Sequence, residues 1–268
     1  MAFHPIALTR HLTRDNPLFV RRSLAGRRAR LVRALSVTLL LILVTHGLTA
    51  AFLVRIMGWA PVIDDPIGLW MVNLFSPSLV ALLIPLLPLL LLPNATVQRA
   101  ASVELRLAGL TPGQICAGQL RPAGAVLLTY QALWLSALVL LSFEPTVARQ
   151  LAEFWESAGT FFGIGGVFVD GLITPWALLL LLWSIGVSRG TLLSAAAVAI
   201  PLAIVLNPLA VLFLIQVMIP FATPEETLVN TGVWTCVVVK SGIAAFHFRS
   251  LHRRFDSIIA ESPLGTGR

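Results

Sequence analysis

Charged side chains are scarce in this sequence, and their scarcity restricts the possible fold classes. Asp, Glu, Lys and Arg make up 12% of the 268 residues, whereas hydrophobic residues make up 57%. A water-soluble domain usually has about twice this charged share. The mean hydropathy of +0.88 points the same way. The composition therefore disfavours a soluble globular fold and predicts an integral membrane protein.

Cysteine is scarce as well, and the motifs of metal sites and intramembrane enzymes are missing. Cys116 and Cys236 are far apart, and neither belongs to a Cys-x-x-Cys or Cys/His pattern that binds zinc. The sequence has no His-Glu-x-x-His motif of a metalloprotease. Ser184 and Ser188 have no evident histidine partner for a serine protease. We therefore expect two buried cysteines, no metal and no catalytic residue.

Long apolar runs, in contrast, fill most of the chain. A bilayer core of about 30 Å is crossed by about 20 helical residues, and helix is expected because lipid cannot satisfy open backbone groups. Six runs are long enough, so the sequence predicts an all-α membrane protein with six transmembrane helices. The expected spans are Ala34–Val54, Val72–Leu92, Ala123–Phe143, Phe168–Val187, Thr191–Ile219 and Val229–Phe248.

These spans divide the chain into a basic N-terminal segment at 1–33, a six-span domain at 34–248 and a C-terminal tail at 249–268. The fifth run is 29 residues long and contains Pro201 and Pro208. Proline breaks the backbone hydrogen-bond ladder of a helix. Two alternatives stay open for this run: one kinked span, or a span followed by a re-entrant piece.

Arginine supplies 18 of the 19 basic residues, and its placement is asymmetric. With both termini on one side of the bilayer, 16 arginines lie on that side and only Arg55 and Arg149 on the other. Short loops that carry Lys and Arg stay in the cytoplasm. We therefore expect both termini in the cytoplasm, in a multi-pass protein of a bacterial-type plasma (inner) membrane.

The segment RDNPLFVRRSLAGRRARLVR, 14–33, has the pattern of a helix at a membrane surface. Asn16 can cap this helix and Pro17 fits its first turn. Arginine side chains can reach lipid phosphates, and the expected anchoring residues are Arg21, Arg22, Arg27, Arg28, Arg30 and Arg33. The alternative is a plain positive-inside anchor with no further role. Nucleic acid is not an expected partner, because no aromatic residues are interleaved with this charge.

A compact charged stretch, VELRLAGLTPGQICAGQLRP at 103–122, separates the second and third runs. Apolar residues recur at helical spacing here, which predicts a helix with one apolar stripe and a separate polar face. The stripe holds Ala100, Val103, Leu107 and Leu110, and the polar face holds Arg99, Ser102 and Arg106.

A second helix is predicted to begin after Thr111. Gly109 loosens the end of the first helix. Thr111 can then cap, Pro112 fits the first turn, and Gln114 can complete a capping box. We expect a helix, a tight corner and a second helix that continues into the third span. The alternative is a loop helix that floats on the bilayer surface.

This stretch resembles the cytoplasmic loop between the second and third spans of ABC transporter permeases of the type-2 exporter class. In that family the loop carries a glutamate, several leucines, Thr-Pro and then a Gly-Lys pair. The matching residues here are Glu104, then Leu105, Leu107 and Leu110, then Thr111-Pro112, and finally Gly118-Gln119. Gln119 departs from the lysine, and Ser102-Val103 stands where the family often has Gly-Thr or Gly-Ser.

The resemblance implies a coupling helix that docks on a separate ABC-type ATP-binding subunit. The residues implied in this contact are Arg99, Glu104, Arg106, Leu107, Leu110, Thr111, Pro112 and Gln119. The N-terminal segment is similar to the interfacial helix of the same permeases, which often begins with Asn-Pro and carries a basic run. This chain has no Gly-x-x-x-x-Gly-Lys-Ser/Thr phosphate loop. ATP and Mg would therefore bind to the partner, and this chain would bind no cofactor.

Permeases of this class work as pairs, which implies a homodimer or a heterodimer with a similar permease. The resemblance thus implies the transport subunit of an ATP-driven exporter, not an enzyme. Two alternatives belong to other classes: a non-catalytic membrane anchor of a larger complex, and an intramembrane enzyme. Co-purification with an ATP-binding subunit distinguishes the transporter from both.

Polar residues inside the expected spans are candidates for a translocation path, because such groups are costly in lipid. Lys240 lies about 12 Å from the inner end of its helix. It either lines the path or pairs with another helix or with headgroups. Asp170 lies near one end of the fourth run, where a structural role is expected. The path candidates, each with a structural hydrogen-bonding role as its alternative, are His46, Asn73, Asn207, Gln216 and Lys240.

Overall fold

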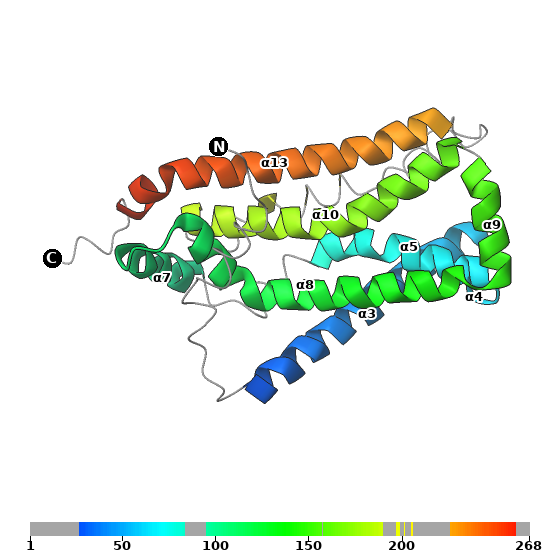
Figure 1. Cartoon of the computed structure of the whole chain (residues 1–268), viewed down its shortest axis with the longest axis horizontal. Coiled ribbons are helices and arrows are strands. Elements are labelled where there is room, and N and C mark those ends of the chain that lie inside the picture. Colours follow the sequence, from blue (N-terminus) through cyan, green and yellow to red (C-terminus); the bar gives the residue numbers. More distant parts are fainter. Residues whose placement is uncertain are drawn as a thin grey trace.

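The computed structural model describes residues 27–83, 95–156, 158–189, 197–198, 201, 205 and 226–260. These ranges are helical apart from short turns and contain no strand. Figure 1 shows the helices in chain order. They are α3 (Arg27–Met57), α4 (Ala60–Ile63), α5 (Pro66–Leu83), α7 (Ala95–Leu107), α8 (Pro112–Ser142), α9 (Pro145–Glu156), α10 (Ala158–Arg189) and α13 (Glu226–Ala260).

Four of these helices are long and apolar enough to cross a membrane. The candidate spans are Ala34–Arg55 in α3, Pro112–Ser142 in α8, Gly163–Ile185 in α10 and Asn230–Ser257 in α13. They correspond to the first, third, fourth and sixth spans expected from the sequence. The described part of the chain is therefore an all-helical bundle with four candidate membrane-spanning helices.

The other two expected spans lie partly or largely outside the described residues. The second is represented by α5, whose apolar part Pro66–Val80 is shorter than the four candidate spans. Residues 84–94 fall outside the described ranges. So does most of the fifth run at 191–219. The count of six spans, and the choice between a kinked span and a re-entrant piece, therefore stay predictions.

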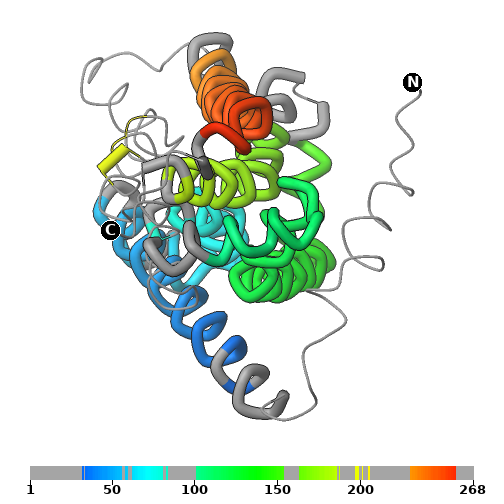
Figure 2. Tube along the Cα trace, turned by 90° about the vertical axis from the view of Figure 1, so that its left-hand side faces the viewer, coloured from blue at the N-terminus to red at the C-terminus, as the bar shows by residue number. Residues whose placement is uncertain are grey.

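The long helices α8, α10 and α13 run in the long direction of the bundle (Figure 1). α10 packs most extensively against α13, and α5 packs against α10, α3 and α8. α7 and the C-terminal end of α13 lie at one end of the bundle, here called the α7 end. α4 and α9 lie at the opposite end. Seen along the bundle, α13 and α8 lie on different sides of α10 (Figure 2).

The helices extend beyond the apolar runs that predicted them, and α3 and α5 already begin at Arg27 and Pro66, before the expected Ala34 and Val72. α8 begins at Pro112, so the second helix of the charged stretch is continuous with the third span, as predicted. α10 begins at Ala158, ten residues before the expected start. α13 continues past Phe248 to Ala260, so residues 249–260 of the expected tail are helical. Leu251 and Phe255 are buried in this extension, which explains why the helix persists after the apolar run ends.

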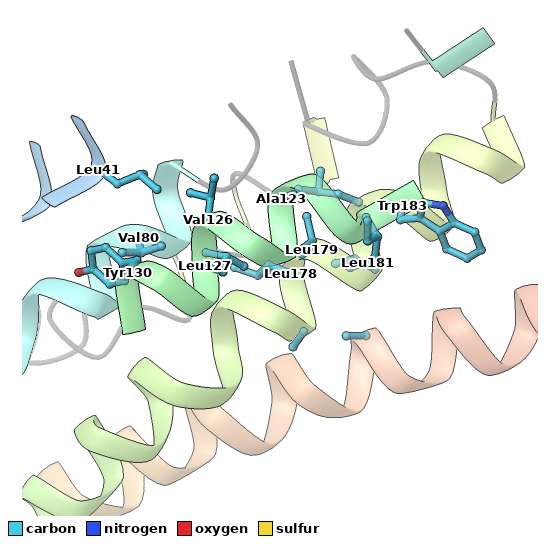
Figure 3. Packing of buried hydrophobic residues seen from close by; sticks show 14 of the residues in the cluster. Leu41, Val80, Ala123, Val126, Leu127, Tyr130, Leu178, Leu179, Leu181 and Trp183 are labelled. Carbon is cyan, nitrogen blue, oxygen red and sulfur yellow. The ribbon is translucent and has the colours of Figure 1, made fainter. Parts of the chain in front are cut away.

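The largest hydrophobic cluster lies mainly between α8 and α10 (Figure 3). On α8, Ala123, Val126, Leu127 and Tyr130 are all fully buried. Their spacing of three and four residues places them on one helical face. They meet a buried leucine-rich segment of α10 that includes Leu178, Leu179 and Leu181. Side-chain packing of this kind holds helices together where lipid provides no hydrophobic driving force.

Glycines on α10 let the neighbouring helices approach closely. A Cβ atom added to Gly171 would lie 2.8 Å from Pro77 Cβ on α5. A Cβ atom on Gly166 would lie 2.7 Å from Val233 Cγ1 on α13. Small residues at such positions are typical of helix pairs in membranes. α10 therefore packs closely against α5 at Gly171 and against α13 at Gly166.

The Gly171→Ala variant should lower the thermal stability of the detergent-solubilised protein. Overpacking of a tight site typically costs about 1–3 kcal/mol, and both Pro77 and Trp134 would have to move. Gly165→Ala on the same helix is the matched control, since its added Cβ meets nothing within 4 Å. Equal melting temperatures for the two variants would contradict the close approach of α5 and α10.

Candidate functional sites: a helical corner and two polar clusters

The α7–α8 corner, residues 104–114, is a tight turn between two helices at the α7 end. The N–H of Gly109 donates to the carbonyl of Arg106, and the N–H of Leu110 donates to the carbonyl of Leu105. This pattern is a Schellman motif. It requires a left-handed residue, and Gly109 has φ +86°. Gly109 thus ends α7 and reverses the chain within a few residues.

The second helix starts with the predicted capping box. The backbone N–H of Gln114 donates to Thr111 Oγ1, and the backbone N–H of Thr111 donates to Gln114 Oε1. Pro112 follows the cap, where its missing N–H costs nothing. These bonds satisfy two donors that a helix start otherwise leaves open. The corner is therefore stiff on both of its sides.

The prediction for the first helix is wrong at two positions, one on the apolar stripe and one on the polar face. Leu107 is 82% exposed, whereas Ser102 is fully buried. Gln119 on α8 explains the exchange, because its Nε2 donates to Ser102 Oγ over 3.0 Å. Trp183 Nε1 on α10 donates to Gln119 Oε1 over 2.8 Å. A polar contact among α7, α8 and α10 thus holds the polar side of α7 inward and leaves Leu107 outside.

The remaining coupling candidates occupy distinct places around the corner. Glu104 is exposed, Leu110 is buried, and Pro112 is partly buried. Arg106 binds Asp256 on α13, and this hydrogen bonding raises the pKa of the Arg106 guanidinium. Arg99 lies on α7, with only its backbone described. The outward surface of the corner therefore contains Glu104 and Leu107.

The Thr111→Ala variant should loosen the start of α8. Loss of an N-cap hydroxyl costs about 1 kcal/mol. We expect faster hydrogen–deuterium exchange in the first turn of α8 and little change at its far end. Thr111→Ser keeps the acceptor oxygen and is the control. Exchange in the Ala variant equal to that in the Ser variant would contradict the role of the cap.

A buried ion pair joins α10 to α13. Lys240 Nζ lies 2.6 Å from Asp170 Oδ1, and both side chains are 0% exposed. Thr174 Oγ1 donates to Asp170 Oδ1 over 2.5 Å, and Ser78 Oγ on α5 donates to Asp170 Oδ2 over 3.4 Å. Buried charges are tolerated when they are paired and hydrogen-bonded. Of the alternatives for Lys240, the structure shows pairing with another helix.

Asp170 lies farther from the start of its helix than the apolar run suggested, and its pairing with Lys240 is the expected structural role. It was expected near one end of its span, yet the candidate span begins at Gly163 and α10 begins at Ala158. The expected run began at Phe168 and left out the glycine-containing segment 158–167, which the helix includes. Gly163 and Gly166 pack closely against Asn230 and Val233 of α13, which brings this part of α10 into the bundle.

The Lys240→Met variant should destabilise the protein more than the double variant Asp170→Leu/Lys240→Met. Removing one partner of a buried ion pair leaves an uncompensated charge and costs about 3–5 kcal/mol, whereas apolar replacement of both is often neutral. Thermal unfolding in detergent of both single variants and the double variant completes a double-mutant cycle. Additive losses would contradict direct pairing.

A second polar cluster lies among α3, α5 and α8. His46 Nε2 is 3.1 Å from Asn73 Oδ1 and 3.3 Å from Ser76 Oγ. Tyr130 OH is 3.4 Å from both Ser76 Oγ and Thr45 Oγ1. His46 and Asn73 are partly exposed, whereas the other three are buried. The structure thus brings together two of the path candidates, His46 and Asn73, in a cluster that does not include Lys240.

Several candidates lie outside the described residues or are described only by their backbone. Asn207, Gln216, Arg21 and Arg22 belong to the first group. The anchoring candidates Arg27, Arg28, Arg30 and Arg33 form the first turns of α3. They therefore continue the helix of the first candidate span, whereas the sequence suggested a separate surface helix up to residue 33.

Comparison with known proteins identified no relative of this chain. No protein-family model, curated protein or solved structure matches this chain. Within the described ranges, no group of three or more His, Cys, Asp or Glu residues is arranged to hold a metal ion. The candidate functional sites are therefore the α7–α8 corner, the Asp170–Lys240 pair and the His46 cluster.

Proposed function

We propose that this chain is the membrane-spanning permease subunit of an ATP-driven ABC transporter, of the exporter class. The α7–α8 corner is its docking element for a separate ATP-binding subunit. That partner binds ATP and Mg and performs the hydrolysis, so this chain is not itself an enzyme. A second permease, either another copy of this chain or a similar one, completes the assembly. The α7 end of the bundle faces the cytoplasm of a cell whose plasma membrane holds the complex.

The observation that carries the proposal is the exposed Leu107 at the tip of a rigid corner. Leu107 is 82% exposed as a residue, next to the exposed Glu104 and the turn at Gly109. A leucine exposed beside a hydrogen-bonded turn gains free energy when a partner covers it. Glu104 adds a charge that can choose the partner and orient it. The corner therefore presents an exposed apolar side chain, Leu107, beside the carboxylate of Glu104, and both can contact a docked partner.

The helix that follows the corner is suited to carry motion. α8 is continuous over 31 residues from Pro112 to Ser142, which is roughly 46 Å at 1.5 Å per residue. The capping box joins its first turn to the corner. Pro122 inside α8 removes one backbone hydrogen bond, but the helix continues past it, so a push on Leu107 would be carried along α8. Packing of α8 against α10 through Ala123, Val126 and Leu127 would pass this motion into the bundle.

The His46 cluster fits a translocation path better than Lys240 does. His46 and Asn73 are partly exposed on α3 and α5, and hydrogen-bonding groups are costly where lipid would face them. Lys240 is fully enclosed and its charge is neutralised by Asp170. We therefore assign His46 and Asn73 to the path and Lys240 to helix pairing.

A pull-down of the tagged chain in mild detergent, followed by mass spectrometry, tests the proposed docking. The unchanged chain should retain an ABC-type ATP-binding subunit. Leu107→Asp should lose that subunit, because a charge replaces the apolar contact. Leu107→Met, which keeps an apolar side chain of similar volume, is the control and should retain it.

Two results would contradict the proposal in different ways. Equal retention by Leu107→Asp and Leu107→Met would remove the docking role from Leu107. Failure of the unchanged chain to retain any ATP-binding subunit in several detergents would overturn the transporter proposal as a whole. The membrane-anchor alternative would then be favoured.

A further inference from the structure

A bidentate ion pair joins α7 to the end of α13. Arg106 Nε donates to Asp256 Oδ1 over 2.6 Å, and Arg106 Nη2 donates to Asp256 Oδ2 over 3.0 Å. The two residues are 150 positions apart in the sequence. A planar guanidinium that meets both carboxylate oxygens fixes direction as well as distance. The contact therefore sets the orientation of α7 relative to α13.

The same guanidinium also binds the corner itself. Arg106 Nη1 donates to the backbone carbonyl of Leu110 over 3.2 Å. Leu110 lies between Gly109, which turns the chain, and Thr111, which caps α8. One side chain thus contacts both the turn and the last helix. While these bonds persist, the corner and the end of α13 move together.

The C-terminal extension of α13, residues 249–260, is fitted to receive this contact. Leu251 and Phe255 are 4% and 1% exposed, so the extension is packed onto the bundle. Asp256 is on its outer side, with a side chain 71% exposed. Farther along α13, roughly 24 Å from Asp256 at 1.5 Å per residue, Lys240 binds Asp170 of α10. α13 therefore connects the corner to the interior ion pair.

The exposure of the Arg106–Asp256 pair speaks against a role in stability alone. The Arg106 side chain is 33% exposed and that of Asp256 is 71% exposed. Ion pairs open to solvent typically contribute little to folding, because water and salt screen them, although bidentate pairs are among the stronger ones. Their bidentate geometry nevertheless restricts relative movement. The buried Leu251 and Phe255 also hold the extension against the bundle.

We propose that Arg106 and Asp256 are positioning residues that join the docking corner to α13. Movement of the corner then reaches the bundle through α13 as well as through α8. This inference rests on the proposed function, because the ATP-binding subunit supplies the movement. Arg106 therefore makes its contacts within the chain. The docking surface consists of Glu104 and Leu107.

Hydrogen–deuterium exchange of the complete transporter tests this role. The permease and its co-purified ATP-binding subunit would be compared without nucleotide and with ATP plus vanadate. In the unchanged complex, nucleotide should alter exchange in the outer half of α13, residues 226–240. Arg106→Ala and Asp256→Ala should each retain the ATP-binding subunit but lose this response. The response within α8 should persist, because α8 follows the corner directly.

Charge exchange provides the rescue. The double variant Arg106→Asp/Asp256→Arg restores an ion pair with the two charges swapped between α7 and α13. We expect it to recover part of the nucleotide response in α13. Arg253→Ala removes an exposed charge from the same extension and is the control that should leave the response intact. Size-exclusion chromatography shows whether each variant remains folded. If one of the single variants is unfolded, the charge-reversed double variant still tests the role of the pair.

Three outcomes would overturn the inference. A full nucleotide response in α13 of both single variants would show that the pair does not transmit movement. No response in α13 of the unchanged complex would exclude this helix as a route, while the retained ATP-binding subunit would leave the proposed function standing. An unchanged chain that retains no ATP-binding subunit would overturn the inference and the proposed function together.

Discussion

Two opposite charges enclosed in an apolar bundle have to face each other, and this constraint sets how α10 and α13 pack. Asp170 and Lys240 are both 0% exposed. Sliding either helix by one turn, about 5.4 Å, would leave both charges unpaired in a medium where each is costly. Gly163 and Gly166 permit the close approach that brings the two groups together. Electrostatics therefore fixes the register, and small residues make that register sterically possible.

The register of α13 has a consequence at the far end of the same helix. With Lys240 fixed on Asp170, the continuous helix carries Asp256 to the α7 end, within reach of Arg106. The buried Leu251 and Phe255 keep the extension from turning away. The placement of an exposed ion pair thus depends on a buried one. A single helix makes both contacts, one with α10 and the other with α7.

The sequence was sufficient to predict features that depend on local patterns. It was insufficient to predict features that depend on which helix faces contact each other. Apolar length predicted the four candidate spans, and Thr111-Pro112 with Gln114 predicted the cap. Helical spacing grouped Leu107 with the apolar stripe, but periodicity does not say which face a neighbour covers. Gln119 on α8 bonds Ser102 and turns that face inward. The partner of Lys240 was also hidden, because hydropathy does not say which helices lie side by side.

Under the proposed docking, movement of the corner reaches the bundle through two different connections, one covalent and one an ion pair. Both connections lead to α10. α8 follows the corner as uninterrupted helix, whereas α13 is joined to it by the Arg106–Asp256 pair. α10 lies between α8 and α13 (Figure 2). It is bonded to α8 through Trp183 and Gln119 and to α13 through the interior ion pair. A displacement of Leu107 would therefore reach α10 from both sides. Close packing at Gly171 also couples α10 to α5, so such a displacement would extend to a further helix of the bundle.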